Sequence, residues 1–520
     1  MYYTSDLCPI WVYNILVNIA WNKMEGGIES TMMLNRRITL LTISIMILIF
    51  LVLLSGCDKQ GKSELLDAEN PVTITVWHYY NGEQQKAFDE MVSEFNETDG
   101  LEKGIVVGSH AYGGVDDLQD AVLNAVHKNV GAADVPNIFS AYADTAYAID
   151  KLGYVVDISK YMTQDELSNY IDGYMEEGKF GKDGEIKIFP VAKATEVFAL
   201  NKTDWDKFSA ATGETDRALG TIEGITEVAE KYYKWTDSLT PNTKNDGKAF
   251  FGRDALANYF IIGYRQLGQE LFTSKDGKTI LNLDERIAKK LWDNYYIPYI
   301  KGYFTSNGRY RSDDVKTGEI IAYVGSTASV TYFPREVIVN DEVSYPIEVA
   351  FYPSPKFAGG EDYAVQQGAG MVITNGKEKE TYASIEFLKW FTQKERNLHF
   401  AINAGYLPVT YEANDEAFAE QAIKGSGESE KLRKLTEVGM KTVNSNKLYT
   451  IKVFEKANDA RKILEYSMSD KAKADRAKVL EKINNGISLD TAVKEYSDDR
   501  NFENWYFELK SELEECVDNE

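Results

Sequence analysis

Residues 72–76 alternate between apolar and polar side chains. Val72, Ile74 and Val76 are separated by threonines, a period of two that is typical of a β-strand with one buried face. Apolar residues then recur at helical spacing between Ala87 and Phe95. The same patterns predict strands at 105–107 and 137–139, a helix over 115–126 and another helix ending near Leu152. Strands that alternate with helices of this length indicate βαβ units and a mostly parallel sheet.

The pattern is less regular further along the chain. Lys182, Asp183 and Gly184 form a hairpin turn signal, with a return strand over 186–189. The pattern also predicts strands at 197–200, 320–324, 347–351 and 371–373, mostly helices between 200 and 300, and an amphipathic helix over 382–391. Beyond Thr410 the charge density rises and helical periodicity continues without strand signals. We therefore expect a helical C-terminal extension.

A long apolar run near the start of the chain has the form of an export signal. Arg36 and Arg37 precede it, and it extends over the 17 residues from Ile38 to Leu54. A small Ser-Gly pair and then Cys57 follow it. A small pair before a cysteine resembles the lipobox of bacterial lipoproteins, in which the cysteine thiol receives a diacylglyceryl group before cleavage.

The lipobox resemblance implies that residues 1–57 are a leader and signal peptide. Cys57 is then the lipidation site, carrying palmitate-type acyl chains, and residues 58–71 form a flexible tether. An uncleaved transmembrane anchor is the alternative, because the run approaches the roughly 20 residues that span a bilayer. In both cases the rest of the chain lies at the extracytoplasmic face of the cell membrane. The signal begins naturally at Met32 or Met33, so either Met1 is too early a start or the leader is unusually long.

Composition restricts the class of protein. A chain of 520 residues with 44% hydrophobic content can fill two to four cores. The net charge of -24 and the lack of a basic stripe after Arg37 argue against a nucleic-acid partner. The three cysteines, Cys8, Cys57 and Cys516, do not form a disulfide framework, so packing alone must hold the mature fold.

The sequence lacks the common catalytic motifs. It has no P-loop, no zinc-protease histidine pair and no nucleophile-elbow serine. The run from Gly368 to Gly370 starts like a dinucleotide fingerprint but lacks the third glycine and the following helix. The four histidines share no metal-ligand spacing. We therefore expect no catalytic residue, no cofactor and no metal site.

Aromatic residues are abundant, with 33 tyrosines, 23 phenylalanines and 8 tryptophans. Tyrosine and tryptophan rings combine an apolar face with a polar group, which suits the faces and hydroxyls of sugars. We assign most of these rings to the core. The exceptions lie at strand ends, where open α/β sheets bind ligands: Trp77, Tyr79, Tyr80, Tyr142 and Tyr406.

One combination of segments resembles a known family. It comprises Gly-Ala-Gly-Met-Val-Ile at 368–373, the helix that holds Phe387, Trp390 and Phe391, and Gly-Tyr-Leu-Pro-Val at 405–409. These segments resemble the family 1 extracellular solute-binding proteins of bacterial ABC importers. Further support comes from residues 76–78, 136–142, 200–202 and 325–328, so that the resemblance covers about 72–410.

The resemblance implies an α/β fold similar to maltose-binding protein, the two-lobed type II periplasmic-binding or Venus-flytrap fold. The first lobe would comprise residues 72–190 plus 366–410, and the second 191–365 plus 411–520 with the helical tail. Ligand contacts carried over from the family are His78, Tyr79, Tyr80, Ser140, Tyr142, Asp144, Lys193, Thr195, Glu196, Ser326, Thr327, Gln367, Gly368 and Tyr406.

Several of these residues have an ordinary structural alternative. Asp144 could cap a helix, Ser326 could satisfy a turn, and Lys193 could pair with a neighbouring carboxylate. The sequence near Ser326 and Thr327 also carries no large ring, which argues against a long maltodextrin as the ligand.

The leading hypothesis is a monomeric lipoprotein that binds a small solute, first of all a carbohydrate, and delivers it to the membrane subunits of an ABC importer without transforming it. An extracytoplasmic glycosidase using two carboxylates is one alternative. A non-transporting sensor or adhesin, with the helical tail as its interaction surface, is another. Mono-, di- and oligosaccharides and polyol phosphates all stay open as ligands. The acidic balance disfavours a highly anionic ligand unless a local cation such as Lys193 or Arg309 compensates.

Overall fold

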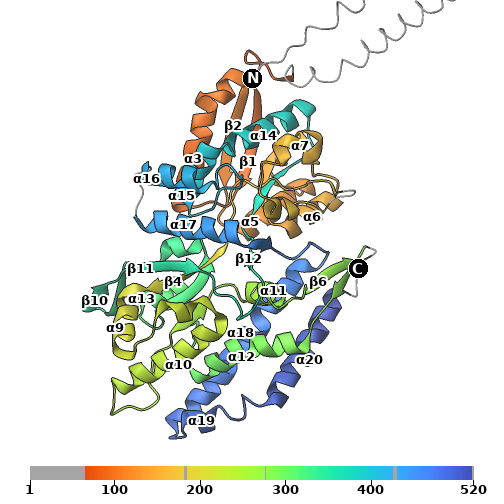
Figure 1. The fold of residues 1–520 in the computed structure, drawn as a ribbon. Helices are drawn as coiled ribbons and strands as arrows, with labels where there is room; N and C mark the ends of the chain where they lie inside the picture. The colour runs from red at the N-terminus through yellow and green to blue at the C-terminus, as the bar shows by residue number, and fades with distance from the viewer. Residues whose placement is uncertain (1–64, 181–183, 276, 426–429, 518–520) are drawn as a thin grey trace, which may run out of the picture. The chain divides into compact units, whose positions relative to one another are not determined.

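The computed structural model describes residues 65–180, 184–275, 277–425 and 430–517. The predicted signal sequence, Cys57 and most of the predicted tether lie outside these residues, as does most of the hairpin turn signal at 182–184. From Leu66 onward the chain folds as one compact unit (Figure 1). Within the described ranges no helix is both long and apolar enough to cross a bilayer.

The first sheet has the strand order β13-β3-β1-β2. Its strands are β1 (Val72–His78), β2 (Ile105–Ala111), β3 (Ile138–Ala141) and β13 (Gly370–Ile373). β1 pairs in parallel with β2 and β3, and β13 runs antiparallel to β3. In β1 the apolar Val72, Ile74 and Val76 are buried while the intervening threonines are exposed. This alternation confirms the predicted strand, and the pairing confirms a mostly parallel sheet.

Helices pack around this sheet, and the longer ones do so through an apolar face. They are α3 (Gly82–Glu97), α4 (Asp99–Lys103), α5 (Val115–Val126), α6 (Ala143–Lys151), α7 (Gln164–Leu167), α8 (Asp172–Glu176), α14 (Glu378–Phe391) and α15 (Lys394–Ala404), with the short η2 (Ile158–Lys160). On α3 the buried side chains are those whose spacing predicted the helix, from Ala87 to Phe95. The predicted return strand over 186–189 is absent among the described strands; Ile186 and Phe189 form only isolated bridges.

The second sheet has the order β11-β4-β8-β5 and mixed pairing. Its strands are β4 (Glu196–Asn201), β5 (Phe251–Arg253), β8 (Ala322–Ser326) and β11 (Val349–Pro353). The other elements here are α9 (Lys202–Thr212), η4 (Asp216–Gly220), α10 (Ile222–Ser238), α11 (Leu256–Gln266), α12 (Glu285–Lys301), α13 (Arg311–Lys316), η5 (Ser329–Tyr332) and the hairpins β6–β7 (Phe272–Lys275, Lys278–Leu281) and β9–β10 (Glu336–Asn340, Val343–Pro346). β4 is buried along its length, as expected for a central strand.

Extended segments connect the two sheets. Lys193 and Leu407 exchange backbone hydrogen bonds of 3.1 and 2.7 Å, and Ala194 and Gln367 exchange bonds of 2.8 and 3.0 Å. Next to them, β12 (Tyr363–Val365) pairs in parallel with β14 (Lys447–Tyr449). β14 corrects the expectation that no strand follows Thr410: it has three residues and is too short to show a period.

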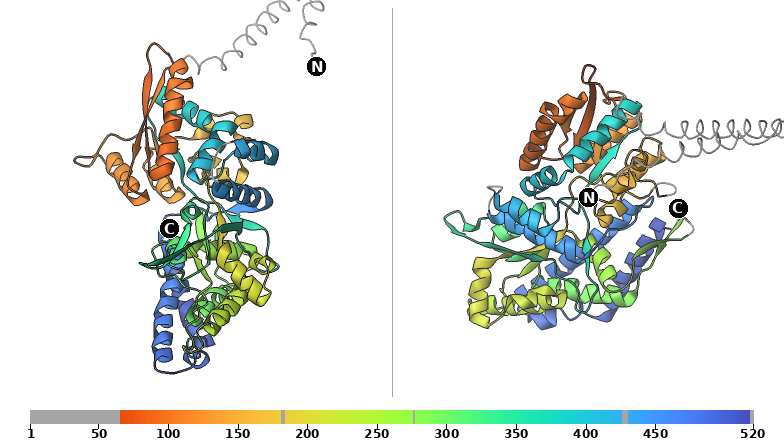
Figure 2. Two further views of the ribbon diagram at one scale, coloured as in Figure 1. Left: turned by 90° about the vertical axis from the view of Figure 1, so that its left-hand side faces the viewer. Right: turned by 45° about the horizontal axis from the view of Figure 1, so that its top comes forward.

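The segment after Thr410 divides between both sheets. α16 (Glu416–Gly425) contacts α15, and α17 (Glu430–Ser445) contacts α15 as well as β4 and β11. The last helices are α18 (Ala457–Asn484), α19 (Leu489–Ala492) and α20 (Asp499–Val517). α18 and α20 pack on α11 and α12, and the two views in Figure 2 show them beside these helices. The helical extension is therefore present. Its first part, α16 and α17, contacts α15 beside the first sheet, and α17 also contacts β4 and β11 of the second sheet.

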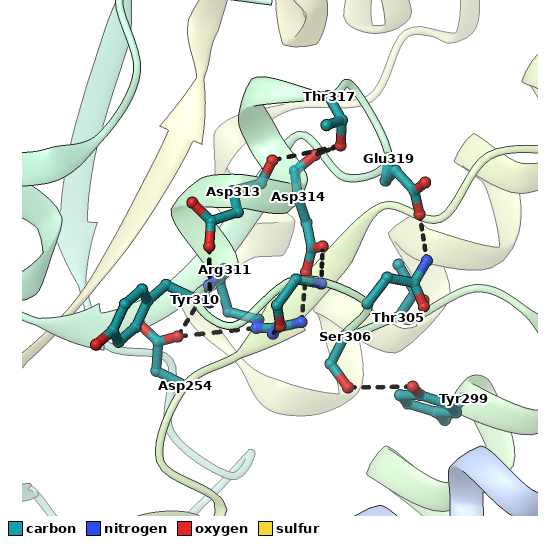
Figure 3. A network of polar contacts seen from close by, with 12 residues as sticks. Asp254, Tyr299, Thr305, Ser306, Tyr310, Arg311, Asp313, Asp314, Thr317 and Glu319 are labelled. Carbon is teal, nitrogen blue, oxygen red and sulfur yellow. Dashed lines mark hydrogen bonds and ion pairs between the residues drawn. The ribbon is translucent and has the colours of Figure 1, made fainter.

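A polar network joins Asp254, the residue after β5, to α13 and to the segment that precedes α13 (Figure 3). The Asp254 carboxylate, just after β5, accepts a hydrogen bond from the backbone N–H of Arg311 at 3.1 Å. The Arg311 guanidinium pairs with the buried Asp314, which also accepts from the Gly308 N–H at 2.6 Å. The pKa of Asp254 is raised to about 6, chiefly by burial and to a lesser extent by Glu196 and Glu465, against the opposing effect of Arg311.

Candidate functional site

A cavity of about 270 Å³ lies between elements of both sheets. The first turns of α5 and α6 form one side, α11 and α18 form the other, and the connecting segment at Gln366 and Gln367 lies between them. Its lining residues are Val115, Asp116, Gln119, Tyr142, Ala143, Asp144, Thr145, Glu177, Asn258, Gln366, Gln367, Thr450, Ile451, Lys452, Val453, Ala457, Asn458 and Arg461.

The topology of the first sheet explains this position. β2 ends at Ala111 and β3 at Ala141, and the chain then starts α5 and α6. Because β1, β2 and β3 are parallel, their carboxyl ends meet at one edge, where open α/β sheets bind ligands. Three of the residues carried over from the family line the cavity: Tyr142, Asp144 and Gln367.

Tyrosines cluster beside the cavity. The Tyr142 ring stacks on Tyr79 with centroids 6.5 Å apart, and Tyr80 packs edge-on against Tyr406 at 6.0 Å. Tyr142 is 36% exposed and presents a ring to the cavity, whereas Tyr80 and Tyr406 are buried. Burial raises the pKa of all four phenols, so they stay neutral and act as hydrogen-bonding groups.

His78 lies outside the cavity lining. Its ring is fully buried between Tyr80 and Phe88, at centroid distances of 5.1 and 4.6 Å. Neither ring nitrogen has a hydrogen-bond partner among the described residues, and burial lowers the pKa of His78 to about 4. Ser140 also lies below the surface, and its hydroxyl donates to the Met371 sulfur at 3.4 Å.

Lys193 forms a buried ion pair. Its ammonium donates to the Glu177 carboxylate and to the carbonyl of Gly368, a residue with a φ of +92°. Burial lowers the pKa of Lys193, and the negative charge of Glu177 opposes this shift. Lys193 therefore neutralises Glu177, which lines the cavity, and offers no charge of its own to a ligand.

A hydrogen-bond network joins the connecting segments to α11 and α18. The Asn258 amide nitrogen donates to Glu196 and to the Gln367 side-chain oxygen, both at 2.9 Å. The Arg461 guanidinium donates to the Asn258 oxygen at 2.7 Å, and Arg253 pairs with Glu196. The network therefore holds Gln367 and Arg461 at fixed places on the cavity wall.

Thr195, Glu196, Ser326 and Thr327 also lie outside the lining of this cavity. The Thr195 hydroxyl donates to the Val365 carbonyl at 2.8 Å, and the Ser326 hydroxyl accepts from the Ala328 N–H at 3.2 Å. The buried Thr327 hydroxyl lacks a partner within the described ranges. Thr195 and Glu196 instead line a second cavity of about 420 Å³, formed mainly by elements of the second sheet.

Several lining residues were not foreseen from the sequence. Asn258 and Arg461 come from helices of the second sheet, and Gln366 precedes the family-derived Gln367. No motif or aromatic ring marks them. Only the neighbouring Gln367 offered a signal, and α18 lies beyond the part of the chain that the resemblance covers.

The two sheets, their extended connections and the polar cavity between them define the class of two-lobed, type II solute-binding folds. Bacterial extracellular solute-binding proteins match residues 90–424, more than half of the chain, and the protein belongs to this family. No curated protein matches the chain.

Solved structures share the fold at low sequence identity. A cyclic α-maltosyl-1,6-maltose binding protein from Arthrobacter globiformis has a TM-score of 0.62 at 15% identity, covering 87% of this chain and 100% of its own. UgpB from Mycobacterium tuberculosis, in complex with glycerophosphocholine, has a TM-score of 0.60 at 17% identity, covering 86% and 100%. Lmo0181 from Listeria monocytogenes, in complex with cycloalternan, has a TM-score of 0.58 at 16% identity, covering 85% and 99%. These similarities confirm the two-lobed fold.

Proposed function

We propose that this protein binds a small carbohydrate-like solute in the 270 Å³ cavity and delivers it to an ABC importer. The observation that carries the proposal is that the cavity wall comes from helices of both sheets and from the segments connecting them. A ligand there contacts both lobes together only when they are closed. It therefore shifts an equilibrium between open and closed forms, and the importer recognises the closed form.

The wall has the chemistry that a hydroxyl-rich ligand needs. Carboxylates of Asp116 and Asp144 accept hydrogen bonds from hydroxyls, side-chain amides donate and accept, and the Tyr142 ring supplies an apolar face. The volume lies near the lower end of the roughly 300 to 1,000 Å³ that is usual for ligand pockets. It therefore favours a small ligand over a long maltodextrin.

The proposal includes the residues and boundaries inferred from the resemblance. Tyr142, Asp144 and Gln367 contact the ligand directly, and the other family-derived residues support them or approach the ligand on closure. The protein acts as a monomer that a lipid on Cys57 holds at the outer face of the cell membrane, and lobe boundaries fall near 190 and 366. It makes and breaks no bond in its ligand.

Binding and closure can be tested together. Thermal unfolding against a panel of saccharides and polyol phosphates should reveal binders, because a ligand at 100 times its Kd adds about 2.7 kcal/mol of stability. Small-angle X-ray scattering with such a binder should show a smaller radius of gyration. Product formation from glycosides would instead support an enzyme, and a panel without any binder would count heavily against a solute-binding role.

A further inference from the structure

Arg461 is a partly buried arginine on the cavity wall without a carboxylate partner. Its guanidinium donates to the neutral Asn258 side chain at 2.7 Å, and no ion pair found among the described residues includes it. A guanidinium has five N–H donors, so most of them stay available. Other arginines of the fold do pair with a carboxylate: Arg253, Arg265, Arg311 and Arg396.

Gln366 gives a second, independent indication. Its side chain is 1% exposed and lines the same cavity, yet neither its amide nitrogen nor its amide oxygen has a partner in the described part of the chain. Buried amides in native proteins are almost always hydrogen-bonded. This amide is therefore preorganised for a ligand that both accepts and donates hydrogen bonds.

Three helices begin at the cavity. The first residues of α5, α6 and α18, namely Val115, Ala143 and Ala457, all line it. In the described chain none of these helices has a hydrogen bond from an N-cap side chain. Their first N–H groups and the positive ends of their dipoles favour negative charge. Asp144 occupies one of these donors, because it accepts from the Thr145 N–H at 2.8 Å.

The charges on the wall restrict how much negative charge a ligand can carry. Lys193 neutralises Glu177, and Lys452 and Arg461 offer positive charge, while Asp116 and Asp144 oppose a further anion. The positive groups lie on the α18 side and the two aspartates on the α5 and α6 side. A ligand that is anionic at one end and hydroxylated at the other matches both sides.

We infer that the ligand carries one anionic oxygen group, a phosphate or a carboxylate, bound by Arg461, the Gln366 amide and the first turn of α18. Its hydroxylated body faces Asp144 and Tyr142. This inference rests on the proposed solute-binding function and adds the charge of the ligand to it. Arg461 is the residue that distinguishes an acidic ligand from its neutral counterpart.

The test is isothermal titration of the purified protein with matched probes. Glucose is compared with glucose 6-phosphate and glucuronate, and glycerol with glycerol 3-phosphate, so that the phosphate and carboxylate arms are separated. We expect at least one anionic probe to bind more tightly than its neutral counterpart. Its Kd should rise about 10- to 100-fold in Arg461→Gln, the range expected for losing hydrogen bonds to a charged group.

Matched variants separate recognition from folding. Arg461→Lys keeps the charge and should retain part of the affinity for the anionic probe. Gln366→Leu should lower the affinity for the same probe. Lys462→Gln changes an exposed neighbour on α18 and should leave that affinity unchanged. The inference would be overturned if neutral probes bound as tightly as the anionic ones, or if Arg461→Gln lowered the affinity for both kinds of probe equally. Either result would leave the solute-binding function standing. A panel in which nothing binds would overturn both.

Discussion

The Glu465 carboxylate on α18 accepts a hydrogen bond of 2.8 Å from the backbone N–H of Ala257 on α11. Its second oxygen accepts from the Leu256 N–H at 3.1 Å, so α18 supplies the cap that α11 lacks in its own N-cap residue, Ala255. Because α11 carries Asn258, this cap also fixes one wall of the cavity.

We expect Glu465→Ala to lower the free energy of unfolding. The variant loses the carboxylate that accepts hydrogen bonds from two backbone N–H groups, and with it a negative charge at a helix N-terminus. Together these contribute about 1–2 kcal/mol. Urea denaturation measures the change, with Glu481→Ala, an exposed residue on the same helix, as the control. Equal stability of the two variants would show that the contact is not an energetically significant cap.

The buried pair of Lys193 and Glu177 makes a stronger prediction. Glu177→Gln leaves the fully buried Lys193 ammonium without its compensating charge, which should cost about 3–5 kcal/mol. Glu176→Gln is the matched control, because the neighbouring Glu176 pairs with Lys179 at the surface and should change stability by less than about 1 kcal/mol. Chemical denaturation at neutral pH compares them. A small effect in Glu177→Gln would mean that the ammonium releases its proton or reaches water.

The first sheet could be predicted from the sequence because local pattern and tertiary contact agree there. β1 shows its alternation, and the helix α3 shows its apolar spacing, so neither depends on distant residues for recognition. β5 and β14 have three residues each, and they are strands only because they pair with β8 and β12. The isolated bridge at Phe189 likewise depends on a distant partner, Met371. Such segments carry too few residues for a period to be visible.

The cavity was only partly predictable for a related reason. Strand ends place Tyr142 at the cavity, and the resemblance supplied Asp144 and Gln367. Arg461 and Asn258 come from helices in distant parts of the sequence, and only packing determines which of their side chains meet. The alternation of β1 did contain one unused signal: His78 lies two residues after Val76 and therefore shares its core-facing side.

Because of Asp254, the free energy of unfolding should fall as the pH rises from 4 to 6. Burial raises its pKa from 3.8 to about 6 in the folded protein. The folded protein binds the carboxyl proton more tightly than the unfolded chain does. The resulting stabilisation is complete at a pH below the pKa of the unfolded chain, and it disappears as the pH rises through the pKa of the folded protein. Asp254→Asn keeps an acceptor for the Arg311 N–H but cannot ionise. Its stability relative to the wild type should therefore increase as the pH rises from 4 to 6. Urea denaturation at several pH values tests this, with the exposed Asp470→Asn as control; a constant difference between wild type and Asp254→Asn would contradict it.

His78 should produce the opposite dependence on pH. Burial lowers its pKa from 6.5 to about 4, with Asp89 opposing and His110 adding to the shift. A neutral buried imidazole contributes stability above the unfolded pKa, and this contribution is lost as the pH falls from 6.5 towards 4, because the unfolded chain then binds the proton first. His78→Leu removes the titrating group. The stability of the wild type relative to this variant should therefore fall over that pH range, whatever the packing cost of leucine, whereas the exposed His127→Gln should leave the dependence unchanged. A parallel pH dependence of wild type and His78→Leu would mean that the ring is accessible to water and free to join the ligand site.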